Sequence, residues 1–303
     1  MYDIIIIGSG PAGMTASIYA RRALKKVLVL EAVSYGGQII NTLDIENYPV
    51  EAHISGFDFS TKLYNQAVDL GAEFIFEKCI KIDKNNSSFD VFTSNSKYQC
   101  KSLIIATGSV NRKLGLERED FFVGKGLSYC ATCDGAFYKK KDVAVVGGGN
   151  TALEDALYLS NICNKVYLIH RRNEFRGDNS VVDKIKGKTN IDIIYNSNVT
   201  KVIGDERLSS IEVSNTDGSI KEIFVSGLFV AIGKIPENEI FKDLIKIDEN
   251  GYILAGEDCH TNIDGIFVAG DNRTKLLRQL VTATSDGAIA ATEAIHYLES
   301  NIK

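Results

Sequence analysis

Two segments of the chain share one pattern, and this pattern limits the possible fold more than any other feature of the sequence. In the first segment, an apolar run at 3–7 leads into G-S-G-P-A-G at 8–13 and a predicted alanine-rich helix at 14–24. In the second, an apolar run at 142–146 leads into G-G-G-N-T-A at 147–152, a predicted helix at 153–160 and a further predicted strand at 165–169. Unbroken β-branched runs predict buried parallel strands, and the glycines predict a tight turn from each strand into a helix. We therefore expect an α/β protein with two copies of one domain.

The order of the remaining strands indicates that one domain is inserted into the other. Apolar strands that end in small residues recur at 103–108 and 228–233, one after each unit. A further strand at 266–269 and a helix from about 280 to 298 follow both units. We infer that this tail returns to complete the first domain. The predicted first domain is then 1–112 with 242–303, and the predicted second domain is 113–241.

The composition is that of an ordinary globular protein. Of the 303 residues, 45% are hydrophobic and 24% are charged, and the net charge is −5. These values argue against a disordered chain, and the negative charge argues against attraction to nucleic acid or to an anionic membrane. Six cysteines are too few for a disulfide-stapled secreted scaffold. The N-terminus lacks a basic region and a long apolar run, so we expect a cytoplasmic protein.

The first glycine motif has the complete context of a dinucleotide site. Gly8 allows the tight turn, Gly10 lets the backbone approach a pyrophosphate, and Gly13 permits close helix packing. The amides at the start of the following helix would face the phosphates. Glu31 comes 18 residues after Gly13 at a strand end, where a carboxylate accepts a hydrogen bond from a ribose 2′-hydroxyl. A purely structural turn is the alternative, but this context favours a nucleotide such as FAD.

The second glycine motif predicts a different nucleotide. It has the form G-x-G-x-x-A through Gly147, Gly149 and Ala152. The strand after it ends in H-R-R-N-E-F-R at 170–176 instead of an acidic residue. Arginines there would pair with a 2′-phosphate, which a carboxylate would repel. We therefore expect NADPH at this site, and the alternative is a solvated run of charges.

Between the two glycine motifs, a C-A-T-C-D-G block at 130–135 predicts redox chemistry. The spacing of Cys130 and Cys133 allows a small disulfide ring, and the adjacent Asp134 could carry a proton. Half a zinc site is one alternative, but Cys259-His260 is the only other close pair, and we expect no metal. Two ordinary buried cysteines are the other alternative. We interpret the remaining cysteines as structural: Cys79, Cys100, Cys163 and Cys259.

Over essentially its full length, the chain resembles the low-molecular-weight, bacterial-type thioredoxin reductases. The C-A-T-C-D-G block immediately before the second glycine motif is the most specific match. In the class that resembles glutathione reductase, the redox pair is C-x-x-x-x-C and lies near the first domain. The other matches are short motifs along the chain: G-G-Q at 36–38, E-N-Y-P at 46–49, A-T-G at 106–108, H-R-R at 170–172, Arg176, G-D at 270–271 and R-Q at 278–279.

The resemblance implies roles for individual residues. Cys133 would face the flavin, Cys130 would attack thioredoxin, and Asp134 would be the acid/base. The residues that would contact FAD are Gly8, Gly10, Pro11, Ala12, Gly13, Glu31, Gly37, Gln38, Asn47, Thr107, Gly108, Asp271, Arg278 and Gln279. The residues that would contact NADPH are Gly147, Gly149, Asn150, Thr151, His170, Arg171, Arg172 and Arg176. Two departures from the family are small: Tyr48 replaces another aromatic residue, and Leu280 follows Gln279 where alanine is more usual.

The resemblance also implies a relay in a homodimer, with electrons passing from NADPH to FAD, to the Cys130–Cys133 disulfide and to thioredoxin. Because the cysteines belong to the inserted domain, the nicotinamide and the disulfide must take turns at the flavin. We expect rotation about hinges near 111–115 and 236–241. Flavin enzymes fed by ferredoxin or using oxygen would lack the arginine motif, and a ferredoxin–NADP reductase would lack the C-x-x-C. A non-catalytic redox sensor that binds both nucleotides is an alternative of another class.

Overall fold

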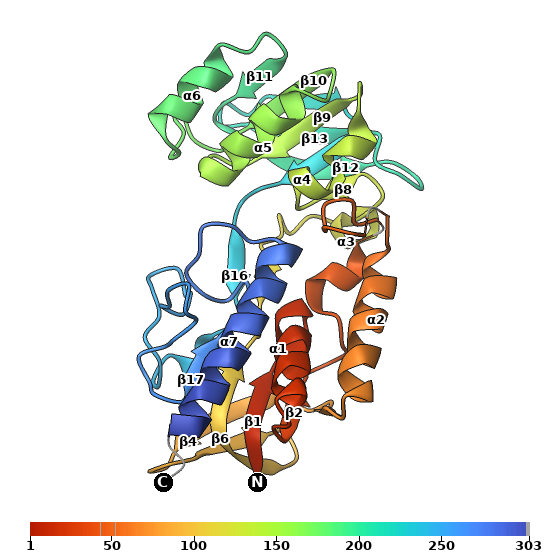
Figure 1. Cartoon of the computed structure of the whole chain (residues 1–303). Coiled ribbons are helices and arrows are strands. Elements are labelled where there is room, and N and C mark those ends of the chain that lie inside the picture. The colour runs from red at the N-terminus through yellow and green to blue at the C-terminus, as the bar shows by residue number, and fades with distance from the viewer. Residues whose placement is uncertain (43, 52, 301–303) are drawn as a thin grey trace. The chain divides into compact units, whose positions relative to one another are not determined.

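The computed structural model describes residues 1–42, 44–51 and 53–300, and its contacts divide the chain into two compact units (Figure 1). Unit 1 consists of Met1–Val110 and Ile235–Lys303, and unit 2 is Asn111–Lys234. Both boundaries precede the predicted ones. The difference is larger at the second boundary because Phe241, which is fully buried, belongs to the core of unit 1.

Unit 1 is built on a seven-stranded sheet whose strands come from both ends of the chain. They are β1 (Tyr2–Ile7), β2 (Val27–Leu30), β3 (Glu73–Ile75), β4 (Cys79–Lys84), β5 (Phe89–Thr93), β6 (Lys97–Ile105) and β17 (Ile266–Val268). Their order is β3-β2-β1-β6-β5-β4, and β17 also pairs with β6. Strands β3, β2, β1, β6 and β17 are parallel, whereas β4 and β5 form an antiparallel meander on β6.

The two faces of this sheet are covered by different layers. Ile4 and Ile6 of β1 are buried in one core with helices α1 (Pro11–Arg22) and α7 (Leu280–Ser300). Ile5 and Ile7 point to the opposite face, into a core that includes residues of β4, β5 and the segment around Phe241. Helix α2 (Gly56–Asp69) contacts α1 on the helical side (Figure 1). Burial on both faces explains why β1 is an unbroken apolar run.

Helices α1 and α7 pack closely because small residues line their contact. A Cβ atom at Gly287 of α7 would lie only 2.2 Å from the carbonyl oxygen of Ala12 in α1. Ala290, Ala291 and Ala294 extend the same buried stripe along α7. The last helix therefore rests directly on the helix of the first glycine motif. This packing agrees with the predicted fold class, in which the tail completes the first domain.

Unit 2 has a second parallel sheet. Its strands are β8 (Leu127–Ser128), β9 (Asp142–Val146), β10 (Lys165–Ile169), β11 (Ile191–Ile194) and β15 (Gly227–Val230). Their order is β11-β10-β9-β15-β8. Helices α5 (Asn150–Ser160) and α6 (Asn179–Lys186) share a core with one face. An antiparallel layer shares a core with the other face, formed by β12 (Ser197–Ile203), β13 (Ser210–Asn215) and β14 (Ile220–Phe224).

Short elements complete the chain. They are η1 (Gly37–Asn41), α3 (Glu119–Phe122), α4 (Ala131–Asp134), η2 (Gly135–Tyr138) and η3 (Glu239–Phe241). The two connections between the units are β7 (Ser109–Asn111) and β16 (Lys234–Pro236), which pair with each other.

Most predicted elements are present, with differences at the helix starts. The strands predicted at 142–146 and 165–169 coincide with β9 and β10. The helices predicted from 14 and 153 begin earlier, at Pro11 and Asn150, because each glycine turn passes directly into the first helical turn. A fold with two Rossmann-like domains is confirmed.

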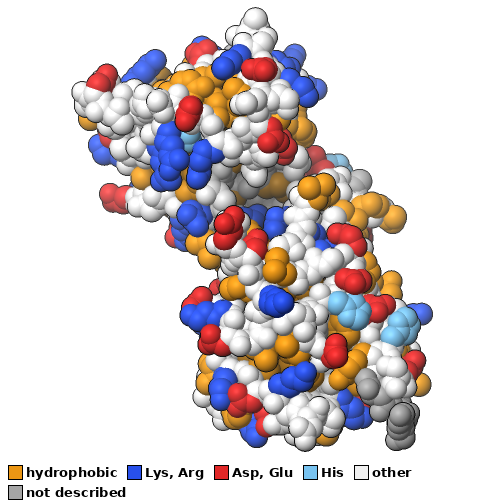
Figure 2. All heavy atoms as spheres, turned by 90° about the vertical axis from the view of Figure 1, so that its left-hand side faces the viewer, with side chains coloured by type: hydrophobic (Ala, Val, Ile, Leu, Met, Phe, Trp, Pro, Cys, Tyr) orange, Lys and Arg blue, Asp and Glu red, His pale blue; other side chains and the backbone are white. Residues whose placement is uncertain are grey.

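The surface carries charges of both signs. Figure 2 shows acidic and basic side chains interspersed over this face of both units, with a larger group of basic side chains on unit 2. Among the described residues, we find no helix that is both long and apolar enough to cross a membrane.

Candidate redox and nucleotide-binding sites

The two cysteines of the C-A-T-C-D-G block form a disulfide. Cys130 and Cys133 have their Cα atoms 5.3 Å apart and are both half-buried. Strand β8 delivers the chain to Cys130, which is the N-cap residue of α4, and the Cys133 amide donates to Cys130 Sγ at 3.2 Å. The block therefore places a disulfide at a position that is neither sealed in a core nor fully solvated. Such a disulfide suits exchange chemistry, which needs an attacking thiolate to reach a sulfur atom.

Asp134 lies beside the disulfide in a partly apolar environment. Its Oδ2 accepts a hydrogen bond from Ser128 Oγ at 2.6 Å, and Ser128 Oγ accepts from the Cys130 amide at 3.0 Å. Burial raises the pKa of Asp134 above its ordinary value, against the opposing effect of the Ser128 hydrogen bond. A carboxyl group with a raised pKa holds its proton closer to neutral pH, which is what an acid/base needs. Ser128, which the sequence analysis did not select, thus connects the acid to the backbone of the redox loop.

Glu119 stabilises the segments that lead into the redox loop, although its role was not predicted from the sequence. Its carboxylate is buried and accepts four hydrogen bonds, from the amides of Leu114, Gly115 and Leu116 and from the Tyr129 hydroxyl. These contacts have donor–acceptor distances of 2.7–3.1 Å. Tyr129 directly precedes Cys130, and 114–116 follow the connection from unit 1. The Glu119 carboxylate therefore links the segment 114–116, where the chain enters unit 2, to Tyr129, the residue before the disulfide.

Replacing Glu119 with glutamine should destabilise this part of unit 2. The amide NH₂ would face backbone N–H donors, so at least one buried donor would lose its acceptor, at about 1–3 kcal/mol each. We expect a loss of about 2–4 kcal/mol in the free energy of unfolding, measured by urea denaturation of the full chain. Tyr129→Phe is the matched control, because it removes one of the four hydrogen bonds and should cost about 1 kcal/mol. Equal losses in the two variants would contradict this view of Glu119.

The first glycine motif lies at the carboxyl end of β1. Gly8 has φ +105°, and a Cβ atom at Gly13 would lie 1.9 Å from the Gly8 carbonyl oxygen. These two positions therefore require glycine. Gly10 is the N-cap residue of α1, and no described side chain caps it. Its Cα would lie 3.1 Å from a Cβ atom at Gly37, so the G-G-Q turn approaches the helix start closely.

Glu31 lies at the end of β2 beside this turn, as predicted from its spacing. Its carboxylate accepts hydrogen bonds from the amide and the hydroxyl of Ser9, each at 2.9 Å, and from the Val33 amide at 3.1 Å. Two carboxylate oxygens offer about four acceptor positions, so three protein donors leave capacity for a ribose hydroxyl. The carboxylate also stabilises the glycine turn, a function that the spacing did not reveal.

The other residues predicted to contact FAD also lie in unit 1. Thr107 and Gly108 follow β6, and Thr107 Oγ1 accepts from Asn272 Nδ2 at 3.1 Å. Asn47 Nδ2 donates to Gln279 Oε1 at 3.1 Å, which joins the E-N-Y-P segment to the loop before α7. The remaining predicted residues are placed as follows: Pro11 and Ala12 in α1, Gln38 in η1, and Asp271 and Arg278 in the loop between β17 and α7.

The guanidinium of Arg278 contacts its own loop. It donates to the carbonyl oxygens of Asp271, Arg273 and Lys275, at 3.1–3.3 Å, and stacks 4.1 Å from the ring centre of Tyr252. The side chain therefore holds together the loop before α7. The last helix begins at Leu280, so Arg278 and Gln279 lie in the loop directly before it.

The second glycine motif faces the arginine segment. Gly149 is the N-cap residue of α5; no described side chain caps it, and a Cβ atom there would meet nothing within 4 Å. Arg171, Arg172 and Arg176 are exposed in the loop after β10. The arrangement leaves uncapped helix amides and several cationic side chains within one βαβ unit. Of the other residues predicted to contact NADPH, Gly147 lies in the turn, and Asn150 and Thr151 lie in the first turn of α5.

His170 is buried, although the resemblance implied that it contacts NADPH. Its Nε2 lies 2.9 Å from the Glu174 carbonyl oxygen, and the ring lies so close to Gly148 that a Cβ there would be 2.2 Å away. Burial lowers the pKa of His170, and the charges of Arg176, Arg172 and Arg171 lower it further, so the ring is neutral at pH 7. His170 therefore packs the arginine loop against the glycine turn.

The other four cysteines are buried thiols, in agreement with the structural role expected for them. Burial raises the pKa of Cys79 and of Cys163 to about 11, and that of Cys100 and of Cys259 to about 12. Thiols with such pKa values are protonated at pH 7 and are poor nucleophiles.

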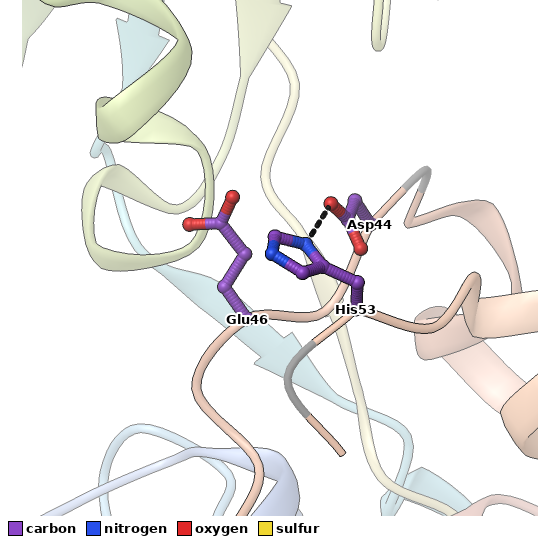
Figure 3. Close-up of side chains that lie close together, drawn as sticks. All are labelled: Asp44, Glu46 and His53. Atoms are coloured by element: carbon purple, nitrogen blue, oxygen red, sulfur yellow. Dashed lines mark hydrogen bonds and ion pairs between the residues drawn. The ribbon is translucent and has the colours of Figure 1, made fainter.

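One further group of polar side chains lies at the surface of unit 1. Asp44, Glu46 and His53 have ligand atoms within 4.8 Å of one another, and Figure 3 shows the His53 ring between the two carboxylates. Asp44 accepts from His53 Nδ1 at 2.9 Å, and this hydrogen bond raises the pKa of His53. The hydrogen bond therefore favours protonated His53, and we interpret Asp44 and His53 as an ion pair at the surface.

Comparisons with known proteins identify the family of this chain. Residues 2–287 match the family model described as pyridine nucleotide-disulphide oxidoreductase. The chain belongs to this family. It is 43% identical to a thioredoxin reductase of Listeria innocua over 99% of this chain and 94% of the relative, and 43% identical to that of Mycoplasma genitalium over 96% and 93%. The crystal structure of thioredoxin reductase from Streptococcus pyogenes superposes with a TM-score of 0.94, at 41% identity and 99% coverage of both chains.

Proposed function

We propose that the protein is an NADPH-dependent thioredoxin-disulfide reductase that uses FAD. The observation that carries this proposal is the half-buried Cys130–Cys133 disulfide beside Asp134, whose pKa is raised by burial. It occurs in a chain that is 41–43% identical, over nearly its full length, to proteins named thioredoxin reductase. Thioredoxin, a small protein with its own redox-active disulfide, is then the substrate.

Unit 1 has the features that FAD requires. The uncapped first turn of α1, with glycines at positions where a side chain would clash, suits a pyrophosphate. Glu31 retains acceptor capacity for a ribose hydroxyl. FAD, when bound, supplies the two-electron chemistry that connects a hydride from NADPH with a disulfide. Unit 2 has an uncapped α5 start and three exposed arginines, which suit the pyrophosphate and the 2′-phosphate of NADPH.

The residues of the redox loop would act in a fixed order. Once the disulfide is reduced, the Cys130 thiolate attacks one sulfur of the thioredoxin disulfide, forming a mixed disulfide and releasing a thioredoxin thiolate, which takes up a proton. Cys133 then attacks Cys130 Sγ, which restores the Cys130–Cys133 disulfide and releases the second thioredoxin thiolate. Asp134 takes the proton of the Cys133 thiol or returns one to a leaving thiolate. Ser128 keeps this carboxyl group in place.

We further propose that unit 2 rotates relative to unit 1 between the half-reactions. The reason is chemical, because the nicotinamide and the Cys130–Cys133 disulfide must each reach the same reactive edge of the flavin. The connections β7 and β16 are short and paired, so they are the segments about which a rigid unit could turn. A homodimer and a cytoplasmic location follow only from the resemblance to bacterial-type thioredoxin reductases, and sedimentation of the purified protein tests the first.

The deciding experiment is anaerobic NADPH oxidation by the FAD-loaded protein, with and without a thioredoxin from the same cell. Rapid oxidation that requires thioredoxin supports the reductase. Reduction of the flavin without turnover of thioredoxin would contradict it and would move the function to another disulfide substrate or to redox sensing. Equal use of NADH would contradict the assignment of the arginines to a 2′-phosphate.

The Asp134→Asn variant should lose activity and gain stability. It cannot transfer a proton, so we expect turnover with thioredoxin to fall about 100-fold or more. Because the pKa of Asp134 is raised in the folded protein, its carboxyl group begins to oppose folding as the pH rises above the unfolded pKa, and this cost grows until the pH reaches the raised value. The variant should therefore unfold at a higher temperature than the parent at pH 8, with a difference that disappears towards pH 4. A stabilised variant with normal turnover would remove Asp134 from the mechanism.

A further inference from the structure

A reciprocal pair of hydrogen bonds joins the arginine loop to the second glycine motif. Asn150, the first residue of α5, accepts from the Asp178 amide through Oδ1 at 2.8 Å. Its Nδ2 donates to Asp178 Oδ2 at 3.1 Å. Asp178 directly precedes α6, yet its side chain caps none of the described amides of that helix. The carboxylate of Asp178 is therefore directed at Asn150 instead of at its own helix.

The same loop is held at other points along its length. The Arg176 amide donates to the Gly148 carbonyl oxygen at 2.7 Å. The His170 ring is buried against Gly148. Gly177 has no space for a side chain, because a Cβ there would lie 2.4 Å from Leu153 Cδ1 and 2.7 Å from Asn150 Oδ1. The loop is thus pressed onto the glycine turn at both ends, and the exposed arginines lie between these points.

We propose that Asp178 is a positioning residue that sets the preference for a 2′-phosphorylated nucleotide. This inference rests on the proposed use of NADPH. Exposed arginines lose conformational freedom when they grip a phosphate, and a loop fixed in advance reduces that loss. The Asn150–Asp178 pair fixes the end of the loop next to Arg176, so the guanidinium groups are presented at a set distance from the amides of α5. Asp178 acts through the loop and does not itself touch the nucleotide.

A carboxylate near a phosphate site also has an opposite effect, which makes the proposal falsifiable. Like charges repel, so Asp178 acting only by its charge would weaken the binding of a 2′-phosphate. Asp178→Asn removes the charge but keeps an oxygen that can accept from Asn150 Nδ2. Asp178→Ala removes both the charge and this oxygen, and leaves only the hydrogen bond from the backbone amide of residue 178 to Asn150 Oδ1. The two variants therefore separate the effect of the hydrogen-bonded pair from the effect of the charge.

The test measures the binding of adenosine 2′,5′-bisphosphate and of adenosine 5′-monophosphate to the FAD-loaded protein by calorimetry. The ratio of the two affinities reports recognition of the 2′-phosphate without requiring turnover. In Asp178→Ala we expect this ratio to fall about tenfold, the size of one hydrogen bond to a charged group, with little change for the monophosphate. Asp178→Asn should keep the parent ratio or exceed it.

A matched control is available at the amino-terminal ends of β9 and β10 in the same sheet. Asn164 Nδ2 donates to Asp142 Oδ1 at 2.6 Å, also joining two segments of one βαβ unit. Asn164→Ala should leave the ratio of the two affinities unchanged. Replacing Arg171, Arg172 and Arg176 together should lower this ratio to about one. Far-ultraviolet circular dichroism confirms that each variant is folded, and Asp178→Asn provides the comparison if Asp178→Ala is not.

Each outcome decides between the two levels of inference. If the parent protein binds both nucleotides equally, the proposed use of NADPH fails, whatever the variants do. If the parent discriminates and Asp178→Ala discriminates equally, the role of Asp178 is overturned while the proposed function stands. A higher ratio in Asp178→Ala would also overturn it, because the charge would then be the dominant effect. A lower ratio in Asp178→Asn as well would assign the effect to the charge itself and would likewise overturn the positioning role.

Discussion

Replacing either Cys130 or Cys133 with serine is expected to abolish the reduction of thioredoxin. The catalytic cycle requires the Cys130–Cys133 disulfide to be reduced and formed again, and this needs both sulfur atoms. Turnover should therefore fall at least about 1,000-fold in both variants. Steady-state NADPH oxidation in the presence of thioredoxin measures the loss. Both residues are half-buried, so we expect the serine variants to fold normally and the loss of turnover to be chemical. Thermal unfolding of each variant checks this.

The two variants should differ in what they trap. If Cys130 is the attacking sulfur, the Cys133→Ser variant forms a mixed disulfide with thioredoxin that cannot proceed to products, because Cys133 is absent. Only the thioredoxin thiol released in this attack can reverse the step, so alkylating that thiol during the reaction retains the adduct. The Cys130→Ser variant should form no such adduct, or far less of it. Mass spectrometry without reducing agent distinguishes the two. An adduct only in Cys130→Ser would reverse the assigned roles, and normal turnover in either variant would exclude the disulfide from the reaction.

The parts of the fold that could be predicted are those in which burial dictates the sequence locally. Strand β9 is buried along nearly its whole length, so its residues are an unbroken apolar run, and the predicted bounds match the observed ones. The turn at Gly8 and Gly13 could also be predicted, because backbone contacts leave no space for a side chain and so require glycine at both positions. The antiparallel layer of unit 2 was not predicted. In β14 only Ile223 is buried, and the exposed Ile220 and Phe224 hide the alternation that would indicate a half-buried strand.

The site divides in the same way. The C-x-x-C spacing and the arginines after β10 could be recognised because each chemical function resides in adjacent residues. Glu119 could not, because its partners are mostly backbone amides, which no sequence pattern marks. Asp178 is 28 residues from Asn150, and an aspartate before a helix is ordinarily a cap. Only the folded chain shows that its side chain bonds elsewhere.

A buried ion cluster under the loop before α7 should contribute strongly to the free energy of unfolding. The Asp286 carboxylate accepts hydrogen bonds from Nε and Nη2 of Arg273 and from Nζ of Lys275, all at 2.8 Å. Its Oδ2 also accepts a hydrogen bond from the Gly270 amide. The three charged side chains are 1–4% exposed. The loop that carries Asp271 and Arg278 is therefore fixed to α7 through one carboxylate.

The Asp286→Asn variant should lose about 3–5 kcal/mol of stability, because two buried cations would lose their buried carboxylate. Of its anionic partners in the described chain, Arg273 would keep only the exposed Glu257, at 3.5 Å. In a domain of this size, the loss of stability corresponds to a fall in Tm on the order of 10 °C. Glu293→Gln is the matched control on the same helix, since Glu293 pairs with His260 and His296 at the surface. It should cost less than about 1 kcal/mol. Circular dichroism during heating measures both, and FAD fluorescence reports whether the loop releases the cofactor first.

The dependence on pH separates the ion cluster from a simple packing defect. Burial alone would raise the pKa of Asp286, but Arg273 and Lys275 outweigh it and hold the pKa below its ordinary value. A carboxylate whose pKa is lowered on folding contributes its stability above its unfolded pKa and loses it as the pH falls through the folded value. The difference in Tm between parent and Asp286→Asn should therefore be constant from pH 5 to 8 and shrink below about pH 4. A difference that persists unchanged at pH 3 would mean that asparagine fails by shape, and that the charge of Asp286 does not hold this loop.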